Sequence, residues 1–94
     1  MLHLVFQPSP LILTRLHHQT AVIFLNHATV MLLKDSQCQA AVQSLVKTSN
    51  CYVLSDDLAI RGIMAHDLID GLQLITYQTF VELTCQNTPI QSWT

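Results

Sequence analysis

Short apolar segments alternate with segments of helical pattern along the chain, and this alternation is the feature that most limits its fold. The apolar segments lie at residues 2–6, 28–33, 51–54 and 72–76. The helical segments lie at residues 11–25, 38–47, 56–61 and 77–86. Strands that alternate with helices of this length are typical of βαβ units with a parallel sheet. The sequence therefore predicts an α/β fold of three layers, in which helices cover both faces of a parallel sheet of about four strands.

Local signals set the expected ends of several elements. Ser9 before Pro10 favours a helix start, because serine caps helices and proline suits the first turn. Gly62 is placed to end the helix at 56–61 in a left-handed conformation. Residues 90–94, "IQSWT", are expected to form a tail after the last helix.

The composition is more apolar than a domain of this size can bury. Of the 94 residues, 50% are apolar and 11% are charged, whereas about 25% charged residues is usual for a soluble domain. A chain of this length is expected to form a single domain over residues 1–94, with much surface for its volume. The spare apolar area is expected to lie in exposed patches, which usually mark association. This indicates a subunit rather than a solitary monomer.

Charge, hydropathy and cysteine count exclude several classes of protein. The formal net charge is −2 with four Lys and Arg in all, so the sequence lacks the basic footprint of direct nucleic-acid binding. No apolar run reaches the roughly 18 residues that a membrane span requires. Three cysteines without paired spacing fit a reducing compartment better than a disulfide framework. We therefore expect a cytoplasmic protein that contacts neither nucleic acid nor membrane.

The sequence contains no established motif for a cofactor or a catalytic nucleophile. P-loop, GxGxxG and GxSxG patterns are all missing,. The five histidines are scattered, and the adjacent His17 and His18 point about 100° apart on a helix, which makes a poor zinc chelate. His3 is expected to be a half-buried, hydrogen-bonded residue of the first strand. The sequence thus predicts no cofactor and no metal site, and it gives little signal for an enzyme.

Ser55, Asp56 and Asp57 stand where the strand at 51–54 passes into a helix. In open α/β proteins, ligands and reacting groups gather at this end of a strand, and paired carboxylates there could bind a cation or share a proton. The other interpretation is local. Ser55 caps the helix, both carboxylates favour its positive N-terminus, and Arg61 complements the other end of the dipole. We favour the local role.

The three cysteines differ in their surroundings. Cys51 begins a buried strand and Cys85 falls on the expected inner face of the last helix, so both are predicted to be core residues. Cys38 lies in the polar segment "DSQCQ" at the expected start of a helix. A thiol near a helix N-terminus tends toward a lowered pKa and greater reactivity. We predict no catalytic residue, and Cys38 is the alternative candidate for one.

Four stretches together resemble one known family. They are "MLHLVFQPSP" (1–10), "VMLLKDSQCQAAV" (30–42), "YVLSDDLAIRGI" (52–63) and "ITYQTFVELTCQNTPIQSW" (75–93). In this order and spacing they are similar to the DsrH/TusB branch of the DsrE/DsrF/DsrH-like sulfur-relay proteins, and the resemblance covers essentially the whole chain. Its most specific parts are the third stretch and the pattern Tyr-x-x-Phe-Val-x-Leu-Thr, which begins at Tyr77 and is followed by Trp93.

The resemblance implies a compact α/β domain assembled with two sister subunits, TusC-like and TusD-like, into a heterohexamer. Such a complex accepts persulfide sulfur and passes it, through a further carrier, toward 2-thiolation of the wobble uridine in certain tRNAs. The sulfur-carrying Cys belongs to the TusD-like sister, in a strand-to-helix loop whose counterpart here is near Ser55. No thiol is present there, so the resemblance implies a structural subunit that does not itself carry sulfur.

Two further features of that family bear on the roles of individual residues. DsrH proteins of sulfur oxidisers carry a Cys within the first helix, and the matching region here, His18 to Thr20, has none, which favours the TusB interpretation. Family members commonly have Asp-Gly after the second strand, where this chain has Asp35-Ser36 and an extra residue before Ala40. Cys38 falls in this altered loop, and we interpret it as a local substitution rather than a relocated carrier.

The sequence leaves three functions open. The first is a structural subunit of a sulfur-relay complex, with Trp93 either as an interface anchor or packed onto its own domain. The second is a stand-alone sulfurtransferase that uses Cys38 as a persulfide carrier, with a DsrH-like role in sulfur oxidation as a variant. The third is a homo-oligomeric α/β protein with a regulatory binding role. The sequence also leaves open whether the isolated chain forms a homo-oligomer.

Overall fold

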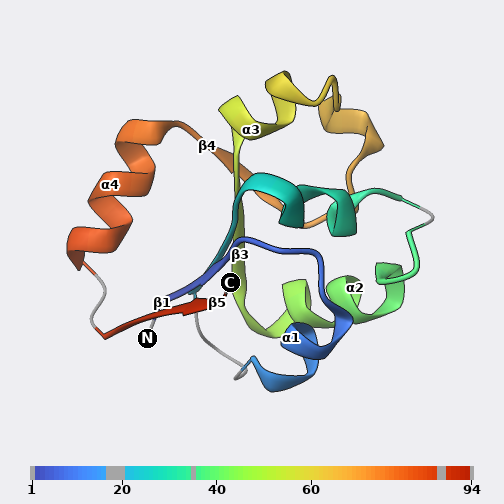
Figure 1. The fold of residues 1–94 in the computed structure, drawn as a ribbon, viewed down its shortest axis with the longest axis horizontal. Helices are drawn as coiled ribbons and strands as arrows, with labels where there is room; N and C mark the ends of the chain where they lie inside the picture. Colours follow the sequence, from blue (N-terminus) through green and yellow to red (C-terminus); the bar gives the residue numbers. More distant parts are fainter. Residues whose placement is uncertain (1, 17–20, 35, 87–88, 94) are drawn as a thin grey trace.

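A parallel sheet, with five strands in the part of the chain that the structure describes, lies at the centre of the fold (Figure 1). The computed structural model describes residues 2–16, 21–34, 36–86 and 89–93, apart from the side chains of residues 10 and 14. The strands are β1 (Leu2–Val5), β2 (Ala21–Phe24), β3 (Asn50–Leu54), β4 (Gln73–Ile75) and β5 (Ile90–Trp93). Their order across the sheet is β4-β3-β2-β1-β5.

Helices connect the strands and confirm the predicted α/β fold. They are α1 (Pro10–Arg15), η1 (Asn26–Leu32), α2 (Gln39–Thr48), α3 (Ser55–Ile60), η2 (Ala65–Asp67) and α4 (Tyr77–Gln86), where η1 and η2 are 3₁₀ helices. All four pairs of neighbouring strands are parallel. Among the described residues, no helix is long and apolar enough to cross a membrane.

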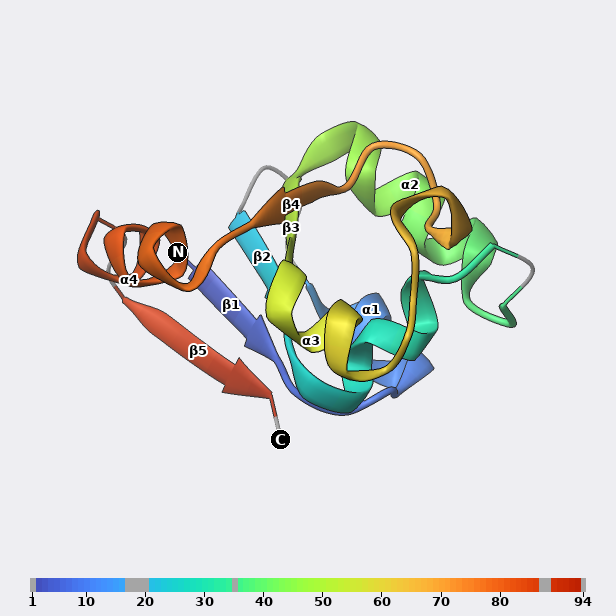
Figure 2. The ribbon, with the colours of Figure 1, turned by 90° about the horizontal axis from the view of Figure 1, so that it is seen from above.

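The helices cover the two faces of the sheet unequally. On one face, side chains of α1, η1, α2 and α3 pack on Val22, Phe24 and Val53 of the sheet. On the other face, Phe80 and Leu83 of α4 pack on a smaller apolar cluster. Figure 2 shows α4 on one side of the sheet, with α1, α2 and α3 on the opposite side. The prediction of helices on both faces is confirmed.

The predicted helix over 11–25 is wrong in its second half. The helix ends at Arg15, and Ala21–Phe24 forms β2, which pairs with both β1 and β3. A run of four apolar residues is too short for its periodicity to separate a buried strand from a buried helix. The neighbouring strands β1 and β3 make this segment a strand, because they provide hydrogen-bond partners for the backbone of β2 on both sides,.

The predicted strand over 28–33 is also wrong, because these residues belong mainly to the 3₁₀ helix η1. Asn26 has a φ of 53°, a left-handed conformation that asparagine tolerates, and it ends the extended backbone of β2. The hydroxyl of Thr29 donates a hydrogen bond of 2.9 Å to the carbonyl of Asn26 and closes the turn. Ala28, Met31 and Leu32 of this segment are thus buried against one face of the sheet rather than within it, and Val30 is exposed.

The tail expected over 90–94 is wrong for its described residues, because Ile90–Trp93 forms the edge strand β5. This strand pairs with β1 from Leu2↔Ile90 to Val5↔Trp93, which raises the described sheet from about four predicted strands to five. The segment "IQSW" contains two strand-favouring residues, Ile90 and Trp93, but it is too short for its pattern to identify a strand. The segment becomes a strand because the free edge of β1 offers hydrogen-bond partners for its backbone.

The other predicted elements are confirmed to within about one residue at each end, which is the usual uncertainty of such boundaries. Ser9 is the N-cap residue of α1, although its side chain makes no capping hydrogen bond. Gly62 follows α3 with a φ of 67°, as a left-handed cap requires. The interpretation of His17 and His18, and of the Cys-free region at 18–20, concerns residues outside those described.

Gly71 and Gly62 provide a matched test of the packing. A Cβ added at Gly71, which has a φ of +99°, would lie 3.0 Å from Val46 Cγ2, whereas one at Gly62 would have nothing within 4 Å. Gly62→Ala is expected to lower the free energy of unfolding by about 1 kcal/mol, the cost of a left-handed backbone. Gly71→Ala is expected to cost about 2–3 kcal/mol, because overpacking adds to the strain. Urea unfolding measures both, and equal losses would contradict close packing of Gly71 on α2.

Candidate functional site

The junction between β3 and α3 is the first place where the sequence suggests chemistry. Ser55 is the first residue of α3, and Leu54 occupies the N-cap position without a side-chain capping hydrogen bond. The prediction that Ser55 caps this helix is therefore wrong, because its own backbone is already helical. Asp56 and Asp57 lie in the first turn, as the dipole interpretation requires,.

Asp57 connects two strand ends rather than offering a free carboxylate. Its Oδ2 accepts a hydrogen bond of 2.8 Å from the backbone N–H of Asn26, and the residue is 8% exposed. This bond joins the carboxyl end of β2 to the start of α3. Arg61 turns back on the same helix and donates a hydrogen bond of 3.2 Å to the carbonyl of Asp57. The paired carboxylates of the sequence thus separate into an exposed Asp56 and a structural Asp57.

Cys38 lies at the N-cap position of α2 and is 8% exposed. It lines a pocket of about 200 Å³ together with Pro8 from the loop after β1, Val30 and Met31 of η1, and Ser36 and Gln37. The preceding element is η1 and not a strand, so the predicted strand-to-helix setting is wrong. The structure nevertheless places this thiol beside a hollow formed by three separate segments, which is the setting that thiol chemistry would need.

The other two cysteines do not share that environment. Cys51, the second residue of β3, is buried, and desolvation raises the pKa of its thiol to about 12. A thiol with such a pKa stays protonated and is a poor nucleophile near neutral pH. Cys85 is exposed, so the prediction of a core position is wrong. The side of α4 that meets the sheet carries Phe80 and Leu83, and Cys85 lies two residues beyond Leu83, on another side of the helix.

Trp93 packs on its own chain. Its indole Nε1 donates a hydrogen bond of 3.1 Å to Nδ1 of His3, and the two ring centroids lie 6.1 Å apart. The indole is half-buried against the larger apolar cluster. His3 is hydrogen-bonded, as its place in the first strand predicts, but at 1% exposure it is fully buried rather than half-buried. Trp93 therefore fixes β5 to β1 through its side chain as well as through its backbone.

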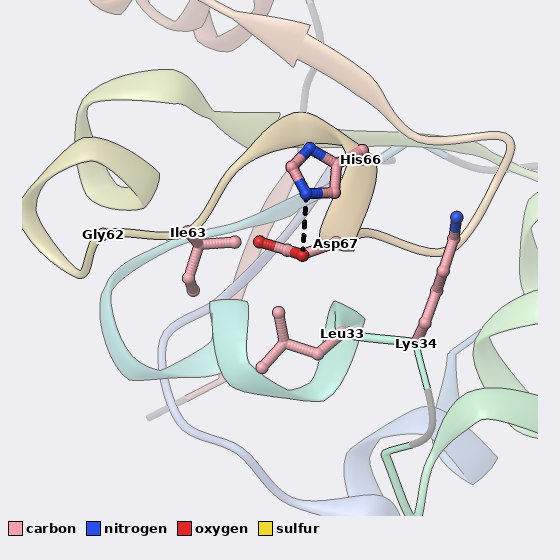
Figure 3. Close-up of a pocket in the computed structure, with 6 residues that line it drawn as sticks. All are labelled: Leu33, Lys34, Gly62, Ile63, His66 and Asp67. Carbon is pink, nitrogen blue, oxygen red and sulfur yellow. Dashed lines mark ion pairs between the residues drawn. The ribbon is translucent and has the colours of Figure 1, made fainter.

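A larger pocket, which the sequence does not signal, lies between the end of η1 and the loop after α3. Its volume is about 480 Å³, and its lining residues are Leu33, Lys34, Gly62, Ile63, His66 and Asp67. Figure 3 shows the imidazole of His66 beside the carboxylate of Asp67, with 3.3 Å between Nε2 and Oδ1. Within the described residues, no three His, Cys, Asp or Glu side chains gather in an arrangement that could hold a metal ion.

An antiparallel contact between two loops forms this pocket. Leu33 and Leu68 make an isolated β-bridge, and the N–H of Lys34 donates a hydrogen bond of 2.8 Å to the carbonyl of Asp67. A second bond of 2.8 Å runs from the N–H of Ile69 to the carbonyl of Leu32. This bridge brings residues that are about thirty positions apart in the chain to one pocket. A local sequence pattern cannot predict such a pocket.

The parallel sheet and its unequal helical layers define a class of small α/β proteins that solved structures already represent. A protein of unknown function from Methanobacterium thermoautotrophicum, MTH1491, superposes with a TM-score of 0.83 at 14% identity, over 98% of this chain and 96% of that one. The ychN protein from E. coli superposes with a TM-score of 0.79, also at 14% identity, over 98% and 97% of the two chains. At this identity the likeness concerns the fold alone.

The sequence itself gives the family. The family model described as "DsrH like protein" matches residues 7–90, and the chain belongs to this family. The predicted resemblance is thereby confirmed, and membership implies in general a subunit of a sulfur relay that works in complexes with DsrE- or DsrF-like partners. A search among curated protein sequences found no match.

Asp57 and Asp56 provide a matched test of the strand-end connection. Asp57→Ala is expected to lower the free energy of unfolding by about 1.5–3 kcal/mol, because it removes a charge-assisted bond and leaves the N–H of Asn26 without its acceptor. Asp56→Ala removes an exposed carboxylate from the same turn and is expected to change stability by less than about 0.5 kcal/mol. Urea unfolding measures both values. Similar small losses would show that the bond to Asn26 contributes little.

Limited alkylation tests the three cysteine environments. At about pH 8, iodoacetamide is expected to modify Cys85 first and Cys38 more slowly, because Cys38 is mostly shielded from solvent. Cys51 is expected to react only when the chain opens, since its thiol is protonated and buried. Peptide mass spectrometry after increasing reaction times gives the order. Modification of Cys51 in the folded protein as fast as that of Cys85 would contradict its burial.

Proposed function

We propose that the chain is a structural subunit, itself carrying no sulfur, of a complex that relays persulfide sulfur toward 2-thiolation of the tRNA wobble uridine. The main support for the proposal is that the residues at the β3–α3 junction stabilise the fold instead of offering a thiol. Position 55 has a hydroxyl rather than a thiol, and the neighbouring Asp57 is committed to the backbone of Asn26. In the sister subunit, the resemblance places the carrier thiol at this junction. In this chain, the same junction contributes to the stability of the fold.

The burial of Cys51 supports this assignment. Cys51 has a pKa raised to about 12 by burial, so it cannot exchange sulfur readily as a thiolate. Cys85 is exposed on α4, at a helix that packs on the less covered face of the sheet. It therefore lies on the opposite side of the sheet from the cluster that includes Cys38.

Assembly with TusC-like and TusD-like sister subunits into a heterohexamer is the second part of the proposal. Large apolar side chains stay exposed on several elements, among them Leu11, Ile60 and Tyr77, and such surface is typical of a subunit. Trp93 keeps part of its surface accessible at the sheet edge, so it can still contribute an interface anchor. We propose a single domain over 1–94, a cytoplasmic location, and indirect delivery to tRNA through a downstream carrier, without direct contact with nucleic acid.

A second candidate function rests on the pocket beside Cys38. A thiol that lines a hollow of about 200 Å³ could hold a persulfide away from bulk solvent, as a stand-alone sulfurtransferase or a DsrH-like subunit in sulfur oxidation would require. One observation argues against this second function: the described residues that line the pocket include no Lys, Arg or His. Such a group is what usually stabilises a reactive thiolate.

The experiment replaces Cys38 by Ser in the cells that encode the protein and measures wobble-uridine 2-thiolation in their tRNA. We expect thiolation to remain at the wild-type level and to be lost when the gene is deleted, because the subunit acts by holding the complex together. Cys85→Ser is the matched control for an exposed thiol. Native mass spectrometry of the tagged chain is expected to show two other small subunits, with extra sulfur on a partner. Loss of thiolation in Cys38→Ser with the complex still assembled would sink the proposal in favour of the second candidate.

A further inference from the structure

His3 is a buried titratable residue of β1, the strand that pairs with the edge strand β5 (Figure 2). Leu2 and Leu4, on either side of it, belong to the smaller apolar cluster. Because side chains alternate along a strand, His3 points to the opposite face of the sheet, where Trp93 packs on the larger cluster. The hydrogen bond from the indole Nε1 to Nδ1 of His3 therefore joins β5 to β1 on that face.

This hydrogen bond fixes the protonation state of the imidazole. The indole N–H can only donate, so Nδ1 of His3 accepts through a free lone pair. A neutral imidazole with an accepting Nδ1 carries its proton on Nε2. Protonation would place a second proton on Nδ1, where one donor would face another. Whatever Nε2 contacts, an imidazolium cannot accept the bond from Trp93.

Trp93 provides most of the side-chain attachment of β5. The other three residues of the strand are exposed, whereas Trp93 is half-buried and packs on the larger apolar cluster. The rest of the attachment is the backbone pairing with β1. Loss of the bond to His3 would therefore loosen the edge strand without removing a residue from the centre of the sheet.

The other titratable groups on this face of the sheet lie in different settings. β2 and β5 contain none, and the larger apolar cluster contains the thiols of Cys38 and Cys51, which stay neutral in acid. The exposed charged and titratable residues on the helices of this face are Arg15, His27, Lys47 and Asp56. The buried Asp57 is bonded to the N–H of Asn26 at the carboxyl ends of the strands, whereas His3 lies near the amino end of β1. Among these described groups, protonation of His3 is the change that acts directly on the edge strand.

We propose that His3 and Trp93 form a pH-sensitive switch at the sheet edge, in which protonation of His3 breaks the bond to the indole and loosens β5. The neutral imidazole accepts this bond and the imidazolium does not, so protons favour the loosened form. The attachment of β5 is therefore complete above the ordinary pKa of histidine, about 6.5, and weakens as the pH falls. The switch depends only on this geometry and is independent of the sulfur-relay proposal.

The fluorescence of Trp93 tests the switch, because Trp93 is the single tryptophan of the chain. The full chain is titrated from about pH 8 to about pH 5, while far-UV circular dichroism monitors the helices. Acrylamide is expected to quench the indole more strongly in acid, reversibly and at pH values where the helix signal is unchanged. Amide hydrogen exchange of residues 90–93, corrected for the intrinsic effect of pH, is expected to accelerate about two- to tenfold, the factor that corresponds to one neutral hydrogen bond. Exchange in β3 is expected to stay the same.

Nitrogen-15 NMR of the imidazole rings identifies the group that titrates. At about pH 8, the proton of His3 is expected on Nε2. The indole N–H signal of Trp93 is expected to shift as His3 becomes protonated. In Trp93→Phe, which keeps an aromatic ring but has no donor, His3 is expected to become protonated at a pH higher by about 0.5–1 unit, because no bond favours its neutral form.

Two further variants provide matched controls. His3→Asn keeps an acceptor oxygen close to the position of Nδ1 but does not titrate in this range, so its indole is expected to stay shielded from acrylamide across the titration. His27→Asn removes an exposed histidine of η1 and is expected to leave the transition unchanged. The NMR titration of the wild-type chain decides the question even where a variant folds poorly.

Four results would overturn the proposal. A proton on Nδ1 at about pH 8 would contradict the hydrogen bond itself. Protonation of His3 without any change in the indole signal or in the exchange of residues 90–93 would show that the two rings are not coupled. A transition that persists in His3→Asn would belong to another group. If His3 stays neutral until the helices are lost, the bond is part of the fold and no switch exists.

Discussion

Backbone pairing of β2 with both β1 and β3 is the constraint on which the rest of the structure depends. Val22, Ile23 and Phe24 are completely buried, and they divide between the two apolar clusters of the sheet. Every helical layer therefore packs on side chains that this strand positions. The hydrogen bond from Asn26 to Asp57 holds the end of β2 against the start of α3. It therefore also fixes the position of β2 relative to β3 at the carboxyl ends of the two strands.

The carboxyl edge of the sheet, where α/β proteins usually place reacting groups, uses its polar side chains mainly for structure here. Asp57 accepts a backbone N–H, Arg61 donates to a carbonyl, and the hydroxyl of Ser36 donates to the carbonyl of Met31. A group that holds the backbone is not free to bind substrate. This use of the edge supports the structural role proposed above for this member of the DsrH-like family.

The sequence predicts the surroundings of some candidate residues correctly and of others wrongly, and each outcome has a physical reason. Cys51 was predicted to be buried because it begins an apolar strand, and strand burial follows composition. Cys85 was misplaced because the phase of a helix is known only once the helix is set on its sheet, and α4 turns Phe80 and Leu83 inward instead. The pocket of Lys34 and His66 had no signal at all, since only the bridge between Leu33 and Leu68 brings its two segments together.

By itself, the sequence determined the class of fold, the family and most of the helices, because periodicity and turn residues act locally. It also determined that no thiol stands at position 55. Only the tertiary structure decided that Ala21–Phe24 is a strand, that residues 26–32 form a 3₁₀ helix and that Ile90–Trp93 closes the sheet edge. Segments of four apolar or mixed residues suit more than one conformation, and the backbone partners that choose between them lie far away in the chain.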